Sequence, residues 1–365
     1  MASVHAGVVD HDFVNDVLNE QARDIRKDIP MRQDPGDLTE YIRCWAEDDV
    51  LDGKPCRALV VILKTRGCTW ALAGGCTMCG YANESAWSKV TAEQLIAQFE
   101  RGWKKYNGEA LVKIYTSGSF IDRHEVPVEA QTAILGRIGA DDRVQKVAFE
   151  ALPGFCTDEA FEPLAKLVPR LEVGIGVESQ NDRILRDSVN KGHPFSAFPD
   201  AAAACKRHNV SVKAYLMCKP PFVKECDALV DATATVQKAA PYSNVVSLNP
   251  TNIQGRTVVD ALHKRGSYRA PWLWTLVHAL RDADDEARQG EPRVIKSDVI
   301  AQGQERGAHN CGACDERVGK YLVKYKETQD KKWLDTCLEK VQCNCRREWR
   351  LTQTLGRLVP AYAKF

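Results

Sequence analysis

The sequence RALVVILKTRGCTWALAGGCTMC, residues 57–79, joins an apolar run to three closely spaced cysteines. Residues 57–63 are mostly apolar, as expected for a strand that is buried on both faces of a parallel sheet. Cys68, Cys76 and Cys79 follow with the spacing C-x7-C-x2-C. Three thiolates can hold three irons of a [4Fe–4S] cube and leave the fourth iron open to a ligand such as S-adenosylmethionine (SAM). A structural zinc site would need a fourth ligand, and this loop offers no further Cys or His.

Apolar runs and segments of helical periodicity alternate after residue 57. Strands are predicted at residues 57–63, 111–116, 147–152, 171–178, 210–217 and 245–248. Helices are predicted at about residues 91–106, 126–138, 157–167, 195–207 and 224–238. Six β–α units imply parallel strands with right-handed crossovers and are too few for an eightfold barrel. We therefore predict an α/β fold, a partial (β/α)6 TIM-like barrel that binds its ligands at the C-terminal ends of the strands.

The chain is divided into three predicted domains. Residues 1–56 are expected to form a helical N-terminal extension, residues 57–270 the partial barrel, and residues 271–365 a small, basic, helical C-terminal domain with a metal knuckle. Residues 315–365 carry twelve basic against seven acidic side chains. A basic segment suits a polyanion such as tRNA, although a solvated helical face has the same composition.

A second group of cysteines lies in the C-terminal domain. Cys311 and Cys314 form a C-x2-C pair, and Cys343 and Cys345 follow about thirty residues later, which is a spacing typical of structural zinc. We predict that these four residues bind zinc, with His309 or Cys337 as possible substitute ligands. An auxiliary iron–sulfur cluster and free thiols are the alternatives.

Polar residues at the predicted strand ends are the candidates for a SAM pocket. Gly118 and Ser119 follow the second strand, and a bare glycine backbone can approach a ligand closely. Glu150 lies within the third strand, where a carboxylate is costly unless it has a partner, either a ligand or a salt bridge at the rim. Glu178 and Gln180 end the fourth strand.

Candidate substrate-binding residues lie at the ends of the last two predicted strands. Lys219 precedes a pair of prolines that fix a rigid turn, and it is expected to point into the cavity. Asn249 and Asn252 offer polar groups to the same mouth of the barrel. A solvated surface lysine is the simpler interpretation of Lys219.

The pattern of residues 57–255 resembles the radical SAM superfamily, in the long-loop branch that includes the catalytic subunit of elongator. TSGSF, residues 116–120, stands in the place of the superfamily's glycine-rich turn, and GIGVESQ, residues 174–180, resembles its SAM-binding stretch. The resemblance implies a fold of the radical SAM type. It also implies that the reduced cluster cleaves SAM to a 5′-deoxyadenosyl radical, which abstracts a hydrogen atom from the substrate.

The chain further resembles the archaeal radical SAM family of archaeosine biosynthesis. The motifs are RGCTW and GGCTMCGY in the cysteine loop, NPTNIQG at residues 249–255 and HNCGACD at residues 309–315. This resemblance implies a cytoplasmic lyase that forms archaeosine in tRNA by cleaving a C–N bond of a lysine-modified 7-deazaguanine in the D-loop. The implied partner is archaeosine synthase, a transglycosylase-like enzyme that attaches the lysine.

Two other functions are compatible with these residues. A radical SAM enzyme for another tRNA base, a peptide or a small metabolite would need no archaeosine precursor. A non-catalytic metal-binding protein would use only the C-terminal cysteines. No apolar run in the sequence approaches the ~18 residues of a membrane span, so no membrane association is expected.

Overall fold

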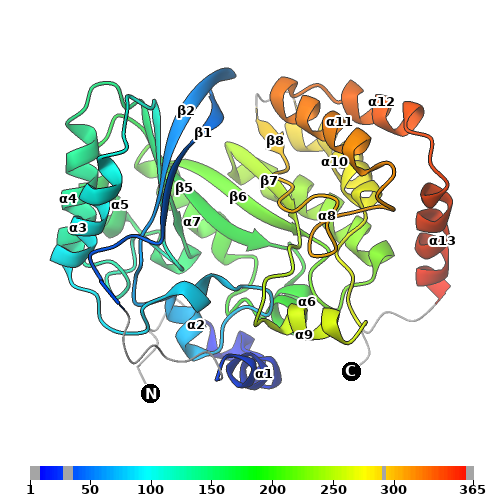
Figure 1. The fold of residues 1–365 in the computed structure, drawn as a ribbon, viewed down its shortest axis with the longest axis horizontal. Coiled ribbons are helices and arrows are strands. Elements are labelled where there is room, and N and C mark those ends of the chain that lie inside the picture. Colours follow the sequence, from blue (N-terminus) through cyan, green and yellow to red (C-terminus); the bar gives the residue numbers. More distant parts are fainter. Residues whose placement is uncertain (1–8, 28–35, 290–292, 359–365) are drawn as a thin grey trace.

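The computed structural model describes residues 9–27, 36–289 and 293–358. In these residues, eight strands form one sheet that curls into a half-barrel with helices on its outer face (Figure 1). The strands lie side by side in chain order; β1 is antiparallel to β2, and every later strand is parallel to the one before it. The strands are β1 (Arg43–Leu51), β2 (Lys54–Ile62), β3 (Leu111–Tyr115), β4 (Lys146–Ala151), β5 (Leu171–Glu178), β6 (Ser211–Cys218), β7 (Val245–Pro250) and β8 (Val294–Lys296).

The helices connect the parallel strands, precede the sheet or form the C-terminal part of the chain. They are α1 (Asp16–Arg26), α2 (Thr69–Ala73), α3 (Ala92–Trp103), α4 (Val128–Gly139), α5 (Asp158–Leu164), α6 (Asp182–Ile184), α7 (Ala197–Arg207), α8 (Glu225–Ala239), α9 (Val258–Lys264), α10 (Leu273–Arg288), α11 (Asp315–Thr328), α12 (Lys332–Lys340) and α13 (Cys345–Leu358).

The predicted partial barrel is confirmed strand by strand. The six predicted strands are β2 to β7, and their parallel order follows the chain. The helix after the cysteine loop begins where the sequence indicates: the Thr91 side chain accepts a hydrogen bond from the Gln94 N–H, and the Gln94 side chain accepts one from the Thr91 N–H.

The flanking regions contribute strands that were not predicted. The expectation of a helical N-terminal extension holds for α1 but is wrong for residues 43–51, which form the long antiparallel strand β1. Acidic residues at alternate positions of this strand face the inside of the half-barrel, so its pattern lacks an apolar face. The short strand β8, from the predicted helical C-terminal domain, extends the sheet beside β7. The division of the chain at residues 56 and 270 stays a prediction.

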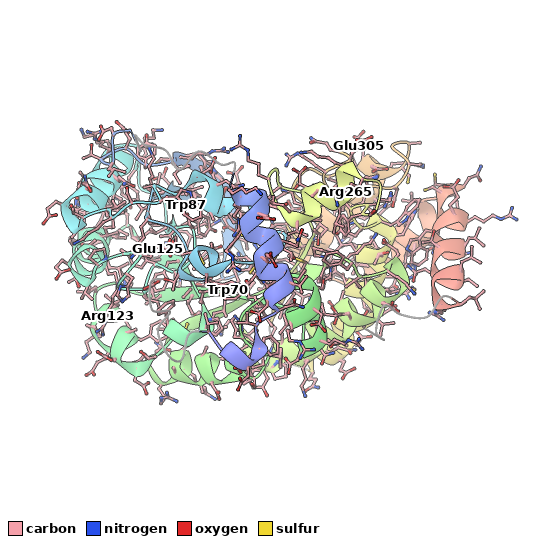
Figure 2. All side chains as sticks on the ribbon, turned by 90° about the horizontal axis from the view of Figure 1, so that it is seen from below. Trp70, Trp87, Arg123, Glu125, Arg265 and Glu305 are labelled. Carbon is pink, nitrogen blue, oxygen red and sulfur yellow. The ribbon has the colours of Figure 1, made fainter. Side chains whose placement is uncertain are left out.

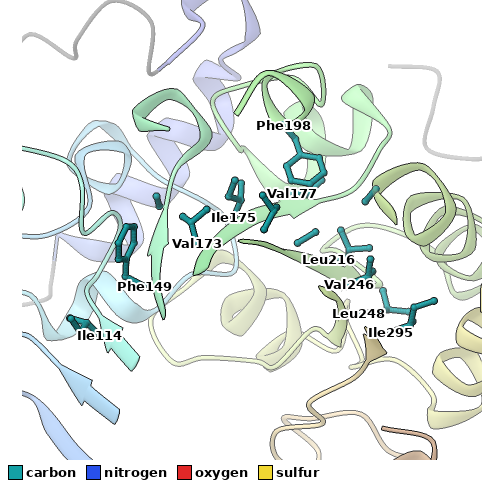
Figure 3. Close-up of a cluster of buried hydrophobic side chains, with 14 of the residues drawn as sticks. Ile114, Phe149, Val173, Ile175, Val177, Phe198, Leu216, Val246, Leu248 and Ile295 are labelled. Carbon is teal, nitrogen blue, oxygen red and sulfur yellow. The ribbon is translucent and has the colours of Figure 1, made fainter. Parts of the chain in front are cut away.

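The hydrophobic core lies between the outer face of the sheet and the helices. Alternate residues of each strand point into it, while the intervening residues face the inside of the half-barrel, which we call the lumen. Figure 3 shows the core side of the strands. Its labelled residues are Ile114, Phe149, Val173, Ile175, Val177, Phe198, Leu216, Val246, Leu248 and Ile295. Burial of this face stabilises the sheet, so the lumen face is free to be polar.

Two glycines of α4 make a matched test of this packing. A Cβ at Gly139 would lie 1.8 Å from the Leu167 carbonyl oxygen, whereas a Cβ at Gly136 would meet nothing within 4 Å. We expect Gly139→Ala to lower the free energy of unfolding by about 1–3 kcal/mol, because the backbone must shift. Gly136→Ala should raise it by about 0.5–1 kcal/mol through helix propensity. Anaerobic denaturant unfolding of both variants measures the difference; equal effects would contradict the packing of α4 on residue 167.

Candidate active site and metal centre

The lumen of the half-barrel is lined by charged and polar side chains that largely pair with one another. Lys113 of β3 lies 2.6 Å from the Glu47 carboxylate and also pairs with Asp49, both on β1. Lys146 pairs with Glu172 on the neighbouring strand. Buried charges need such partners, because desolvation is costly. These pairs occupy the half of the lumen away from the C-terminal ends of the strands.

The three loop cysteines lie at the C-terminal end of β2, at the mouth of the lumen. Cys68 precedes the single-turn helix α2, and Cys76 and Cys79 follow it. Burial raises the pKa of the Cys76 thiol to about 12 and also raises the pKa values of Cys68 and Cys79. Thiols in such a site become thiolates only when a cation compensates their charge, and iron is such a cation. The chemistry of this donor set therefore fits an iron–sulfur cluster.

Helix α1 binds the backbone of the cysteine loop from outside (Figure 2). The Arg26 guanidinium donates hydrogen bonds to the carbonyl oxygens of Cys76 and Cys79, each at 3.3 Å, and to that of Gly74. Arg23 donates to the Ala73 carbonyl at 3.1 Å. The positive charge of Arg26 also favours thiolates at Cys76 and Cys79. No local motif marks Arg26, because the sequence of a helix outside the barrel gives no signal of what the helix contacts.

The segment after α6 holds the same loop from the inside. The Trp70 indole N–H donates to the Asn190 carbonyl at 2.7 Å, and the Asn190 side-chain amide donates to the Gly75 carbonyl at 2.9 Å. The Thr77 hydroxyl donates to the Ser188 carbonyl at 2.7 Å. The loop is thereby fixed on two sides, which sets the positions of its three sulfur atoms.

The turn after β3 contains Gly118 and Ser119 and faces Cys68. The N–H groups of Ser117, Gly118 and Ser119 all donate to the buried carboxylate of Glu125, at 3.0, 3.1 and 2.7 Å. A Cβ at residue 118 would lie 2.7 Å from the Cys68 Cβ, so only glycine fits there. Among the described residues, nothing donates to the carbonyl oxygens of Ser117 and Gly118.

Two features of this turn bear on a ligand. Its free carbonyl oxygens can accept hydrogen bonds from an ammonium group, and the buried Ser119 hydroxyl has no hydrogen-bond partner in the described structure. No sequence motif marks Glu125, because it follows the turn by several residues and its contact depends on the fold. Burial raises its pKa to about 7, although the Ser119 N–H and the Thr65 hydroxyl oppose that rise.

Glu150 and Glu178 both face the lumen near its mouth. Glu178 pairs with Lys191 at 2.8 Å, and both side chains are largely buried. Burial raises the pKa of Glu150, while Lys213 and the Tyr215 hydroxyl oppose that rise. Gly174 and Gly176 of β5 belong to the segment that resembles the superfamily's SAM-binding stretch. In the structure, a Cβ at Gly174 would lie 2.6 Å from the Tyr215 ring, and one at Gly176 would lie 2.7 Å from the Lys191 Nζ.

The remaining predicted residues lie at the mouth but differ in what they offer a ligand. Lys219 does not point freely into the cavity as expected, because its ammonium pairs with Glu225 at 2.7 Å and donates to the Arg269 carbonyl. Gln180 is half-buried, and its backbone N–H donates to the Thr235 hydroxyl. Asn249 accepts from the Asp298 N–H at 3.0 Å, and Asn252 accepts from Arg306 at 3.2 Å.

The C-terminal cysteines form one compact group. The sulfur atoms of Cys311, Cys314, Cys343 and Cys345 all lie within 4.8 Å of one another. The sulfur atoms of Cys311 and Cys343 are 3.5 Å apart, and those of Cys314 and Cys345 are 3.6 Å apart. The sulfur atoms of Cys343 and Cys345 are 3.4 Å apart. A tetrahedral zinc ion with Zn–S bonds of about 2.3 Å holds its sulfurs about 3.8 Å apart. The donor set therefore fits one such ion.

Hydrogen bonds from outside the group orient two of these sulfurs. The Trp274 indole N–H donates to Cys345 and the Asn310 amide donates to Cys314, both at 3.3 Å. N–H groups of this kind support bound thiolates at metal sites. Neither suggested substitute joins the group: the His309 imidazole bonds to the Gly307 carbonyl, and Cys337 lies buried elsewhere.

A half-barrel with three cysteines on the loop after its first parallel strand defines the radical SAM class of proteins. The model of the Radical SAM superfamily matches residues 62–232. The chain belongs to this superfamily and, within it, to the family of archaeosine synthase subunit beta, because relatives of that name match most of its length at 35–38% identity. The superfamily implies a [4Fe–4S] cluster and SAM, and makes the protein a radical SAM enzyme. No helix in the described part of the chain is long and apolar enough to cross a membrane.

Two relatives named archaeosine synthase subunit beta match almost the whole chain. That of Methanosarcina acetivorans is 38% identical, over 91% of this chain and 95% of the relative. That of Thermococcus kodakarensis is 35% identical, over 86% of this chain and 97% of the relative. Among solved structures, the archaeal Elp3 of Methanocaldococcus infernus is 16% identical, covers 64% of this chain and 58% of its own, and superimposes with a TM-score of 0.44.

The two arginines of α1 test how the cysteine loop is held. Arg26→Gln removes a charged donor from several loop carbonyls, where each hydrogen bond to a charged group contributes about 1.5–3 kcal/mol. We expect a lower content of iron and sulfide per protein after anaerobic reconstitution and gel filtration, and an altered EPR spectrum of the reduced protein. Arg23→Gln, the control, loses one exposed contact and should leave both unchanged. Identical cluster content and spectra in both variants would contradict the role of Arg26.

Proposed function

We propose that the protein is the radical SAM lyase that completes archaeosine in tRNA, by cleaving a C–N bond of a lysine-modified 7-deazaguanine in the D-loop. The observation that carries the proposal is the match of nearly the whole chain to relatives named archaeosine synthase subunit beta. The cysteine loop at the mouth of a polar lumen supports it. The same name supports association with an archaeosine synthase partner that supplies the lysine adduct, and a tRNA substrate would place the enzyme in the cytoplasm.

The residues at the mouth fit the two cofactors. Cys68, Cys76 and Cys79 would ligate three irons of the cluster. The free carbonyl oxygens of the turn at Gly118, together with the Ser119 hydroxyl, would bind the amino-acid end of SAM. Glu150, Glu178 and Gln180 would line the remainder of the pocket, with Lys191 moving from its place over Gly176 to admit the ligand.

The protein's own part in the reaction is to position the substrate and exclude water. When bound, the cluster and SAM supply a 5′-deoxyadenosyl radical that abstracts one hydrogen atom from the lysine moiety. The sheet forms one side of the lumen, and α1 lies against the cysteine loop at the C-terminal end of β2, where it would help to exclude water. Among the predicted substrate residues, Asn249 and Asn252 remain at the mouth for the base or its linker, whereas Lys219 has a structural ion pair.

The basic C-terminal domain supports tRNA binding. Arg347 and Arg350 lie on the same helix, α13, as the zinc ligand candidate Cys345, and Trp333 of α12 stacks under the Lys324 ammonium at 4.3 Å. Arginine and lysine side chains on a rigid support bind phosphates, and a partly exposed ring such as that of Trp333 can stack on a base.

The test of this function is product formation by the anaerobically reconstituted protein. With SAM, a reductant and tRNA that carries the lysine–deazaguanine adduct, we expect 5′-deoxyadenosine and archaeosine to form together. Cys79→Ala should abolish both products, because an incomplete set of thiolates cannot hold the cluster. Cys56→Ala, a half-buried thiol of β2, is the control and should remain active.

Two outcomes would contradict the proposal in different ways. Release of 5′-deoxyadenosine that does not depend on the adduct would keep the radical chemistry and exclude this substrate. Archaeosine formation without SAM cleavage would exclude the radical mechanism.

We further propose that Cys311, Cys314, Cys343 and Cys345 bind one structural zinc ion. The sulfur contacts of 3.4–3.6 Å support it, because an iron–sulfur cube holds its thiolates on separate irons and therefore farther apart. The ion would tie α13 to the start of α11 and stabilise the basic domain.

Elemental analysis tests the zinc site. Wild-type protein should contain about one zinc per chain, and Cys345→Ser should lose it together with part of the thermal stability. Cys337→Ser changes a buried thiol outside the group and should keep the metal. Zinc that survives Cys345→Ser, or iron in its place, would contradict the assignment.

A further inference from the structure

One lysine of the lumen forms no ion pair, although its charge acts on the carboxyl groups of Glu150 and Asp298. Lys213 lies on the lumen face of β6, since its neighbours Val212 and Ala214 are in the core. Among the described residues, its ammonium makes no ion pair or hydrogen bond; the contact that it makes is with the ring of Tyr215, at 4.6 Å. By contrast, Lys113, Lys146 and Lys296 on the sheet's inner face are paired with acids. An unpaired cation inside a barrel is costly without a ligand.

A second lysine on the inner face of the sheet, Lys296, shares its carboxylate partner with another lysine. Lys296 of β8 lies 3.0 Å from Asp298, and Lys326 of α11 lies 2.5 Å from the same carboxylate. Asp298 is held in place, since its N–H donates to the Asn249 side chain at 3.0 Å. Two ammonium groups therefore share one carboxylate, and Lys213 adds a third positive charge.

The strand register places Lys213 and Lys296 within reach of one ligand group. Lys213 pairs with Val245, and Ser247, two residues farther along β7, pairs with Lys296. The backbones of β6 and β8 are two strand spacings apart, about 10 Å. Two lysine side chains can span this distance from opposite sides to meet on one carboxylate. Burial and the nearby charge of Lys213 lower the pKa of Lys296 to about 8, although Asp298 opposes this, so a bound anion would relieve the repulsion.

We propose that Lys213 and Lys296 form an anion subsite on the β6–β8 wall of the lumen, which binds the α-carboxylate of the substrate's lysine moiety. This inference rests on the proposed function and names the part of the substrate that enters the lumen. A phosphate of the tRNA offers the same anionic oxygens. The position of the subsite favours the carboxylate, because an extended side chain on a base reaches a site on the strands themselves, whereas the backbone of a folded tRNA stays outside the half-barrel.

The experiment compares two tRNA adducts that differ only in the carboxylate. One carries lysine on the deazaguanine, and the other carries cadaverine, which is lysine without its carboxylate. Dissociation constants are measured anaerobically with the holoenzyme and a SAM analogue that is not cleaved. We expect wild-type protein to bind the lysine adduct about 10- to 100-fold more tightly, as expected for charge-assisted hydrogen bonds. Lys213→Met should bind both adducts alike, and Lys213→Arg should restore part of the preference.

Controls separate a subsite from a structural effect. Lys206→Met, on the exposed face of α7, should behave like wild type. SAM affinity and cluster content should be the same in all variants, because the subsite holds substrate and not cofactor.

Three results would overturn the subsite: equal binding of both adducts by wild-type protein, an undiminished preference in Lys213→Met, or an equal loss of affinity for both adducts, which would indicate a phosphate contact. A failure of the proposed function is distinguishable from these. In that case wild-type protein would prefer the lysine adduct and yet form no archaeosine from it.

Discussion

The cysteine loop has little regular structure of its own, and its geometry depends on hydrogen bonds from other parts of the chain. A loop that carries three metal ligands must keep its sulfurs at fixed separations, and one short helix, α2, cannot do this. Arg26 of α1 binds the loop's carbonyl groups on one side, and Asn190 and Ser188 bind it on the other. Arg26 lies more than a hundred positions before Ser188 and Asn190 in the sequence. The N-terminal helix, although outside the barrel, is therefore part of the candidate site.

The two faces of the sheet differ in composition and in role. The outer face packs against the helices and supplies the buried apolar area that stabilises the fold. The lumen face can then carry lysines and acids, because their pairing offsets much of the cost of desolvation. The pairing is incomplete at Lys213 and at the shared carboxylate of Asp298, and we attribute this imbalance to the proposed anion subsite.

The sequence predicted those parts of the fold that depend on local pattern. Continuous apolar runs identify β2 to β7, and a capping box identifies the start of α3. Strand β1 was missed because its acidic residues face Lys113, which lies more than sixty residues farther along the chain, so the pairing is visible only in the folded sheet. Cysteine spacing likewise identified the C-terminal group, whose four sulfurs the structure brings together.

What could not be predicted are contacts between distant segments. Glu125 supplies the carboxylate around which the turn at Gly118 folds, and Arg26 and Asn190 hold the cysteine loop, yet none of them belongs to a local motif. For Lys219 the local pattern was misleading, because Glu225, the first residue of α8, pairs with its ammonium. Such residues become recognisable only when burial and partners are known.

The central claim is that the loop thiolates leave one iron of a cluster open for SAM. Electron–nuclear double resonance of the reduced protein, with SAM labelled with 15N at its amino group or 17O at its carboxylate, tests this claim most directly. We predict hyperfine coupling of both labels to the cluster in wild-type protein, at positions consistent with direct ligation. A reduced cluster whose spectrum does not respond to either labelled SAM would contradict the account, because the open iron would then have another ligand.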